Sequence, residues 1–211
     1  YIITNKNIDK ILNIEFSTKN KPKEKDKKSS FQSYLFYPKQ YDKLFWCFYI
    51  FQNGLDEFKQ IDNKHFMIEK ECKLDFVSTI RENSSILKEK KIKKIETELD
   101  IVNSKKITLN SFHAFCLYHQ LNVIVIKKNI YYHFNPDDEL KVHIVDLSTD
   151  FIGCRPNVDS ELLDKLLKNK IYIENPDRPI RSLSFYKISD LHDLAKKINI
   201  DIVSVSYTHL T

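Results

Sequence analysis

The segment YDKLFWCFYIFQNG, which ends at Gly54, constrains the fold most strongly. Nearly every side chain between Asp42 and Gly54 is apolar or aromatic, on all sides of any helix formed there. Asp42 is a favourable N-cap residue, and Gly54 is a favourable residue just beyond a helix C-terminus. A helix that is hydrophobic all round must be buried. We therefore predict that this segment is the central helix of the core.

Apolar residues at helical spacing predict three further helices, over residues 65–80, 84–102 and 108–121. The sets expected to face inward are Ile68, Cys72, Phe76 and Ile80 in the first, Ile92, Ile95, Leu99 and Val102 in the second, and Leu109, Phe112, Phe115, Cys116 and Leu121 in the third.

The hydrophobic period then changes to that of strands. Residues 123–127 and 130–134 predict a hairpin around Lys128 and Asn129, and residues 142–147 predict a third strand. A short helix over 160–168 and a short strand over 171–173 follow. Helices followed by strands indicate an α+β fold. We expect a helical first half with a buried central helix, a small and mostly antiparallel sheet in the second half, and a C-terminal amphipathic helix.

The chain has 211 residues, 42% of them hydrophobic and 30% charged, which is typical of a globular protein. We expect a core domain over 38–175 and a helical segment over 176–204, with a basic linker over 18–37 and a fragment of a preceding element over 1–17. Six lysines crowd the linker, which favours a solvated tether, although a phosphate-binding arm is the alternative. Both ends look cut, and residues 205–211 (VSYTHLT) resemble a translated sequencing adapter.

Composition excludes several classes of protein. With two glycines in the chain, phosphate-binding loops and dinucleotide fingerprints are excluded. The four cysteines form no CxxC pair, so we expect free thiols in a reducing compartment, no metal and no cofactor. No apolar run approaches the roughly 18 residues of a membrane span, and no signal peptide is present, so we expect neither membrane association nor secretion.

The net charge of +5 raises a nucleic-acid hypothesis without deciding it. Lys, Ile and Asn are abundant while Gly, Ala and Arg are scarce, a bias expected of an AT-rich genome. Part of the lysine excess therefore reflects codon usage.

The stretch PIRSLSFYKISDLHDLAKKINI, residues 179–200, carries one apolar face. From Leu183 onward it resembles the first half of a SAP module, a helix–loop–helix family that binds DNA or RNA. The resemblance implies phosphate contacts by five basic residues: Arg178, Arg181, Lys187, Lys196 and Lys197. An ordinary amphipathic helix docking on a partner is the alternative.

Residues 41–46 (YDKLFW) resemble the start of the central helix in OTU-type, papain-like cysteine proteases, and residues 109–134 resemble the helix and two strands that follow it. The position of that family's cysteine is occupied here by Lys43, and Cys47 stands one turn further on. His143 is the histidine on a late strand. The resemblance implies a degenerate protease scaffold, with a Cys47–His143 dyad as the alternative.

Two further groups carry weaker signals. His113, Cys116 and His119 share one helix, but the two histidines are related by a rotation of about 240° around the helix axis, which disfavours one metal site. The run PDDELK contains Asp137, Asp138, Glu139 and Lys141, an arrangement that is faintly nuclease-like and equally typical of a hairpin loop.

The succession of LFWCFYI, a helical middle, FHAFCLYHQLNVIVIKKNIYYHF and the SAP-like end resembles a protein family of nucleocytoplasmic large DNA viruses. That resemblance implies a virus factory in the host cytoplasm, or a virion, with other viral proteins as partners, and it carries no activity with it. Our leading hypothesis is a non-enzymatic viral protein that binds nucleic acid through its C-terminal segment. A papain-like protease or deubiquitinase and a metal-dependent nuclease are the alternatives.

Overall fold

The computed structural model describes residues 34–176 and 185–197. At its centre lies helix α2 (Lys43–Asn53), with every side chain from Leu44 to Phe51 buried. Asp42 caps the helix by accepting a hydrogen bond from Phe45 N. Gly54 ends it at φ 94°, a conformation that residues with a Cβ rarely adopt. The predicted central helix is confirmed.

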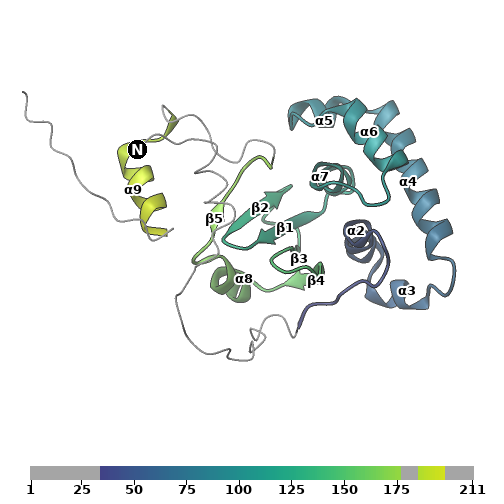
Figure 1. Ribbon diagram of the computed structural model, residues 1–211, viewed down its shortest axis with the longest axis horizontal. Helices are drawn as coiled ribbons and strands as arrows, with labels where there is room; N and C mark the ends of the chain where they lie inside the picture. The colour runs from purple at the N-terminus through teal and green to yellow at the C-terminus, as the bar shows by residue number, and fades with distance from the viewer. Residues whose placement is uncertain (1–33, 177–184, 198–211) are drawn as a thin grey trace, which may run out of the picture.

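Two helices, α3 (Leu55–Gln60) and α4 (His65–Glu82), lie on the side of α2 that faces away from the sheet (Figure 1). Helix α7 (Leu109–Tyr118) packs beside α2, α5 (Ser85–Glu89) packs on α7, and α6 (Lys94–Asn103) packs on α4 and α7. The inward residues predicted for α4 and α7 are buried in or packed against the main apolar cluster.

The single helix predicted over 84–102 is wrong, because α5 and α6 are separate. Lys91 adopts φ 57°, and Ile92 N donates to Leu87 O while Lys91 N donates to Lys88 O. These two bonds form a Schellman motif that ends α5.

Of the inward set predicted for this region, Ile92 packs against the main apolar cluster, but the prediction is wrong for the other three residues. On α6 the side chains that face inward are Thr97 and Ile101, whereas Ile95, Leu99 and Val102 are 73%, 56% and 52% exposed. The break at Lys91 resets the helical phase, so spacing counted across it no longer identifies one face.

The sheet has the order β4-β3-β1-β2-β5, with strands β1 (Asn122–Lys127), β2 (Ile130–Phe134), β3 (Val142–Asp146), β4 (Gly153–Val158) and β5 (Ile171–Tyr172). The β1–β2 and β3–β4 pairs are antiparallel, and the β1–β3 and β2–β5 pairs are parallel. The α+β class is confirmed, with a mixed sheet.

The two faces of the sheet are both covered. Val123 and Val125 of β1 pack with α2 and α7, while Ile124 and Ile126 pack with the leucines of α8 (Ser160–Leu167). Because side chains alternate along a strand, α8 lies on the face opposite α2 (Figure 1). The molecule therefore has a sheet between a thick helical layer and one short helix.

Strand β4 was not predicted from the sequence. It is an edge strand that contains Pro156. Proline, which has no backbone N–H, is tolerated at a sheet edge because the N–H groups on the outer side are not hydrogen-bonded to a neighbouring strand of the sheet. Its outer side forms a bridge with Phe36, and Leu35 is buried nearby. Leu35 and Phe36, which fall within the predicted linker, therefore pack as part of the core.

Helix α9 (Ile188–Lys197) stands apart from the sheet and its covering helices (Figure 1). Ile188, the first residue of this helix, is 74% exposed. None of the helices within 34–176 and 185–197 combines the length and apolar composition needed to cross a bilayer.

Candidate functional site

The N-terminus of α2, where a papain-like enzyme would hold its nucleophile, is occupied by a buried ionic network. Asp42 is fully buried and its Oδ2 accepts hydrogen bonds from Lys73 Nζ at 2.6 Å and Ile107 N at 3.0 Å. Lys73 Nζ also reaches Glu69 Oε1 at 2.8 Å, and Trp46 Nε1 donates to Glu69 Oε2 at 2.9 Å. The network joins α2, α4 and the segment before α7.

Lys43, at the position of the family's cysteine, lies with its Nζ 5.4 Å from the centroid of the Phe151 ring. It therefore contacts the loop between β3 and β4 through a cation–π interaction. Asp42, directly before it, is committed to the buried network.

Cys47 lies one turn further along α2 with no exposed surface. Burial, followed by a hydrogen bond with Cys154, raises the pKa of its thiol. Nucleophilic cysteines need the opposite shift, because the thiolate is the reactive form. Among the described residues, the hydrogen-bond partner of Cys47 is a second thiol rather than an imidazole.

His143 lies on β3 and meets α2 at Phe51, with ring centroids 4.6 Å apart. Its Nδ1 accepts a long hydrogen bond, 3.4 Å, from the backbone N–H of Asn157. Burial and the nearby Lys141 lower the pKa of His143 to about 4. These contacts fit a core histidine stacked on a phenylalanine.

The three residues His113, Cys116 and His119 each face a different environment. His113 stacks on Phe134 with centroids 4.1 Å apart, Cys116 is fully buried, and His119 lies 4.9 Å from the Phe48 ring. Burial lowers the pKa of both histidines, that of His113 to about 4. Within the described residues, no group of three or more His, Cys, Asp and Glu side chains could hold a metal ion.

The PDDELK run forms a turn. Asp137 Oδ1 accepts a hydrogen bond from Glu139 N at 2.8 Å, which is the bond of an Asx turn, and Asp137 O accepts one from Asn122 Nδ2. These bonds give Asp137 a role in loop geometry. Among the described residues, no group of three or more His, Cys, Asp and Glu side chains that could hold a metal ion is formed by this run.

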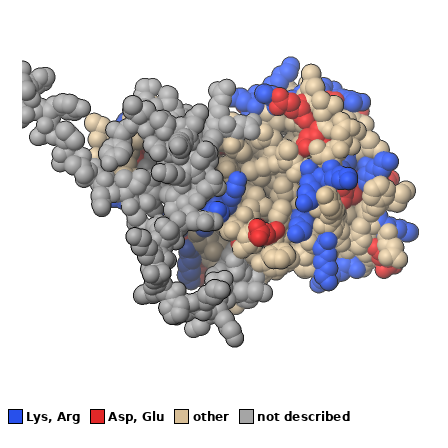
Figure 2. All heavy atoms as spheres, in the orientation of Figure 1, with Lys and Arg blue, Asp and Glu red and all other residues tan. Residues whose placement is uncertain are grey.

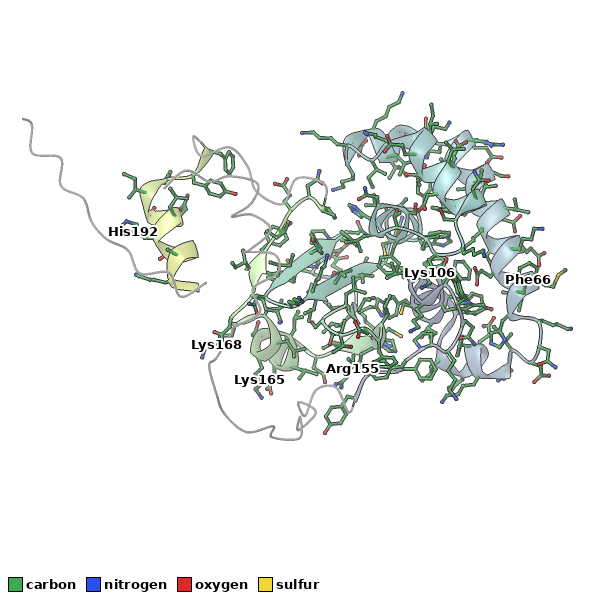
Figure 3. All side chains as sticks on the ribbon, in the orientation of Figure 1. Phe66, Lys106, Arg155, Lys165, Lys168 and His192 are labelled. Carbon is green, nitrogen blue, oxygen red and sulfur yellow. The ribbon has the colours of Figure 1, made fainter. Side chains whose placement is uncertain are left out.

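Only part of the predicted nucleic-acid-binding set lies in the described residues. Lys187 and Lys196 are exposed on or next to α9, which also carries His192 (Figure 3). Asp190 closes the first turn by accepting a hydrogen bond from Lys187 N at 3.1 Å. Arg178, Arg181 and the side chain of Lys197 lie outside the described residues.

A basic group that the sequence interpretation missed lies at the junction of α5 and α6, and we call it the lysine junction. It comprises Lys88, Lys90, Lys91, Lys93 and Lys94. Lys93 and Lys94 pair with Glu96 and Glu98, whereas Lys88, Lys90 and Lys91 are exposed and have no ion-pair partner among the described residues. Five lysines in seven positions were visible in the sequence, but the run was absorbed into a predicted continuous helix.

The lysine junction adjoins the point where the C-terminal segment leaves the core. Lys90 and Lys91 line a recess together with Glu174, Asn175 and Pro176. Figure 2 shows basic side chains along the upper edge of the molecule, where α5 lies, with acidic ones just below. The lysine junction thus lies beside residues 174–176, the last described residues before the C-terminal segment.

Comparisons with protein families, with curated proteins and with solved structures give no match.

Proposed function

We propose that this chain is a non-enzymatic protein that binds nucleic acid through the lysine junction and the C-terminal basic segment. The observation that carries the proposal is the position of Lys90 and Lys91 beside Pro176, which precedes Arg178 by two positions in the sequence. Lys88, Lys90 and Lys91 have no ion-pair partner among the described residues and can contact phosphates. The sequence after Pro176 carries further basic residues that we propose add to these contacts.

The chemistry of α2 supports a scaffold rather than a protease. The Cys47 thiol is inaccessible and its pKa is raised by burial, while the network of Asp42, Glu69 and Lys73 ties α2 to its neighbours. We accordingly propose that the chain resembles papain-like proteases in its architecture and not in its catalytic activity. The viral setting remains part of the same proposal.

The test measures binding of the full chain to fluorescein-labelled duplex DNA and single-stranded RNA by anisotropy, between about 50 and 200 mM salt. One variant carries Lys88→Gln, Lys90→Gln and Lys91→Gln. A second carries Arg178→Gln, Arg181→Gln and Lys187→Gln. The matched control carries Lys39→Gln, Lys64→Gln and Lys70→Gln, three exposed lysines of the α2–α4 region.

We expect each test variant to weaken binding about tenfold or more. The slope of log K against log salt should also become shallower, by about 0.9 for each duplex phosphate that the variant no longer neutralises. The control should keep the slope of the natural chain. Absent binding, salt-insensitive binding, or equal weakening in the test and control variants would contradict the proposal.

A further inference from the structure

Two tyrosines lie side by side on the face of the sheet that α8 covers. Tyr131 of β2 pairs with Ile126 of β1 and with Tyr172 of β5, so the three side chains project from one face. Ile126 packs with the leucines of α8. The two tyrosine rings have centroids 5.4 Å apart and planes inclined at 43°. The pair therefore continues this face to the edge of the sheet, which β5 forms.

The two rings differ in how far they are covered. Tyr131 is half-buried and packs against the cluster that α8 forms with the sheet. Tyr172 is 49% exposed and belongs to neither apolar cluster. Its backbone is fixed by the pairing with β2, and its ring is supported on one side by Tyr131. An exposed aromatic ring on a sheet is the kind of surface on which unpaired bases stack.

Three lysines lie at the end of the sheet beside this pair, and we call Lys128, Lys168 and Lys170 the edge lysines. Lys170 Nζ donates to Lys128 O at 2.5 Å, and Ile171 N donates to Asn129 O at 2.8 Å, so the β1–β2 turn is bonded to the start of β5. Lys168 lies at the end of α8, two positions before Lys170 (Figure 3).

The edge lysines carry charge that the described part of the chain does not neutralise. Lys128 and Lys168 are exposed, and none of the three forms an ion pair with another described residue. Positive charge beside an exposed aromatic ring is complementary to a ligand that is both anionic and planar. Nucleic acid has this chemistry, with phosphates for the lysines and bases for the ring.

The chain leads from this pair to the lysine junction over a short distance. Pro176 lines a recess with Lys90 and Lys91, and it follows Tyr172 by four positions. Four residues span at most about 14 Å. One strand of nucleic acid can therefore contact the tyrosine pair and the lysine junction together.

We infer that Tyr172, supported by Tyr131, stacks on a base of single-stranded nucleic acid, with the edge lysines on the neighbouring phosphates. The inference rests on the proposed function and narrows its ligand. Bases of a duplex are paired and stacked on one another, whereas a single strand offers free base faces. The lysines attract either form, and the exposed ring selects the single strand.

Fluorescence anisotropy of the full chain tests the inference. The ligands are fluorescein-labelled oligothymidylate and oligouridylate of about 12 nucleotides, and a DNA duplex of the same length. Tyr172→Leu removes the ring and keeps an apolar side chain, whereas Tyr172→Phe keeps the ring. A further variant carries Lys128→Gln and Lys168→Gln. The control is Tyr41→Leu, which removes another exposed tyrosine, before α2.

We expect Tyr172→Leu to weaken single-strand binding about tenfold and to change duplex binding by less than about twofold. Tyr172→Phe and Tyr41→Leu should bind the single strands as the natural chain does. The double lysine variant should weaken binding of both forms and make the salt dependence shallower. Unchanged single-strand binding in Tyr172→Leu, equal losses for single strand and duplex, or a loss in Tyr172→Phe as large as in Tyr172→Leu would overturn the inference.

A second measurement locates the stacked base without any substitution. An oligonucleotide that carries 5-iodouracil is cross-linked to the natural chain by ultraviolet light, and the modified peptide is identified by mass spectrometry. We expect the adduct on Tyr172. Adducts confined to other residues would contradict the inference.

The outcome is separable from that of the proposed function. Single-strand binding that depends on Tyr172 but not on Lys88, Lys90 and Lys91 would remove the lysine junction alone. Duplex binding that depends on the lysine junction, with single-strand binding indifferent to Tyr172→Leu, would remove the stacking site alone.

Discussion

His113 lies on α7 with its ring against Phe134, and burial, with a contribution from Lys90, lowers its pKa to about 4. In an unfolded chain a histidine titrates near pH 6.5. Between these pH values His113 binds a proton in the unfolded state but stays neutral in the folded state. The free energy of unfolding therefore falls as the pH is lowered from about 6.5 toward 4. Above that window the histidine is neutral in both states and contributes no pH dependence.

The variant His113→Phe keeps an aromatic ring on Phe134 but cannot titrate. We expect its free energy of unfolding near pH 7 to remain close to that of the natural chain, and to fall less steeply between pH 6.5 and 4.5. Urea unfolding at several pH values measures the slope. His192→Phe, on exposed α9, is the control and should keep the natural slope. A slope in His113→Phe as steep as in the natural chain would contradict the assignment.

Residue type alone could not identify these environments. The sequence places Cys47 and His143 on a helix and a strand, and both placements are confirmed. Which neighbours they meet depends on packing: Cys47 meets Cys154 of an edge strand that was not predicted, and His143 meets Phe51. Such contacts join residues far apart in the chain, and no local pattern encodes them.

At the scale of elements, Lys73 is the link between α2 and α4. Its side chain is 9% exposed and contacts both Asp42 and Glu69. Its Nζ also lies 5.3 Å from the centroid of the Phe45 ring. Because Asp42 also holds Phe45 N and Ile107 N, one carboxylate positions three segments. Local capping predicted the bond to Phe45 N, but the bonds to Lys73 and Ile107 could be found only in the folded chain.

Replacing Lys73 with methionine keeps most of the apolar stem and removes the charge. We expect the free energy of unfolding to fall by about 3–5 kcal/mol, because Asp42 is left as an unpaired buried charge. The matched control is Lys70→Met, which changes an exposed lysine of the same helix and should alter stability by less than about 0.5 kcal/mol. Chemical denaturation measures both, and similar small decreases in the two variants would show that the network contributes little.

At the scale of the whole molecule, the described apolar core is formed by the sheet and its two covering layers, without a described contribution from α9. Among the described residues, neither apolar cluster includes one from α9. The last element of the sheet, β5, pairs with β2 and ends at Tyr172, before the C-terminal segment begins. The predicted division into a core over 38–175 and a segment over 176–204 is therefore open to a direct test.

A chain that ends at Pro176 should unfold with a midpoint and a denaturant slope close to those of the full chain. Its free energy of unfolding should agree within about 0.5 kcal/mol, because no buried contact in the described part of the core depends on α9. Urea unfolding followed by the fluorescence of Trp46 measures both quantities. A decrease of more than about 1 kcal/mol would show that the C-terminal segment docks on the core.

The sequence by itself determined the elements whose character is local. The apolar run of α2, with Asp42 and Gly54 at its ends, specified a buried helix, and alternation specified the β1–β2 hairpin. The tertiary structure decided what local patterns leave open: the inward face of α6, the edge strand β4, the neighbours of Cys47, and the meeting of Lys90 with Pro176. Periodicity and capping act within a few residues, whereas burial is set by segments distant in the chain.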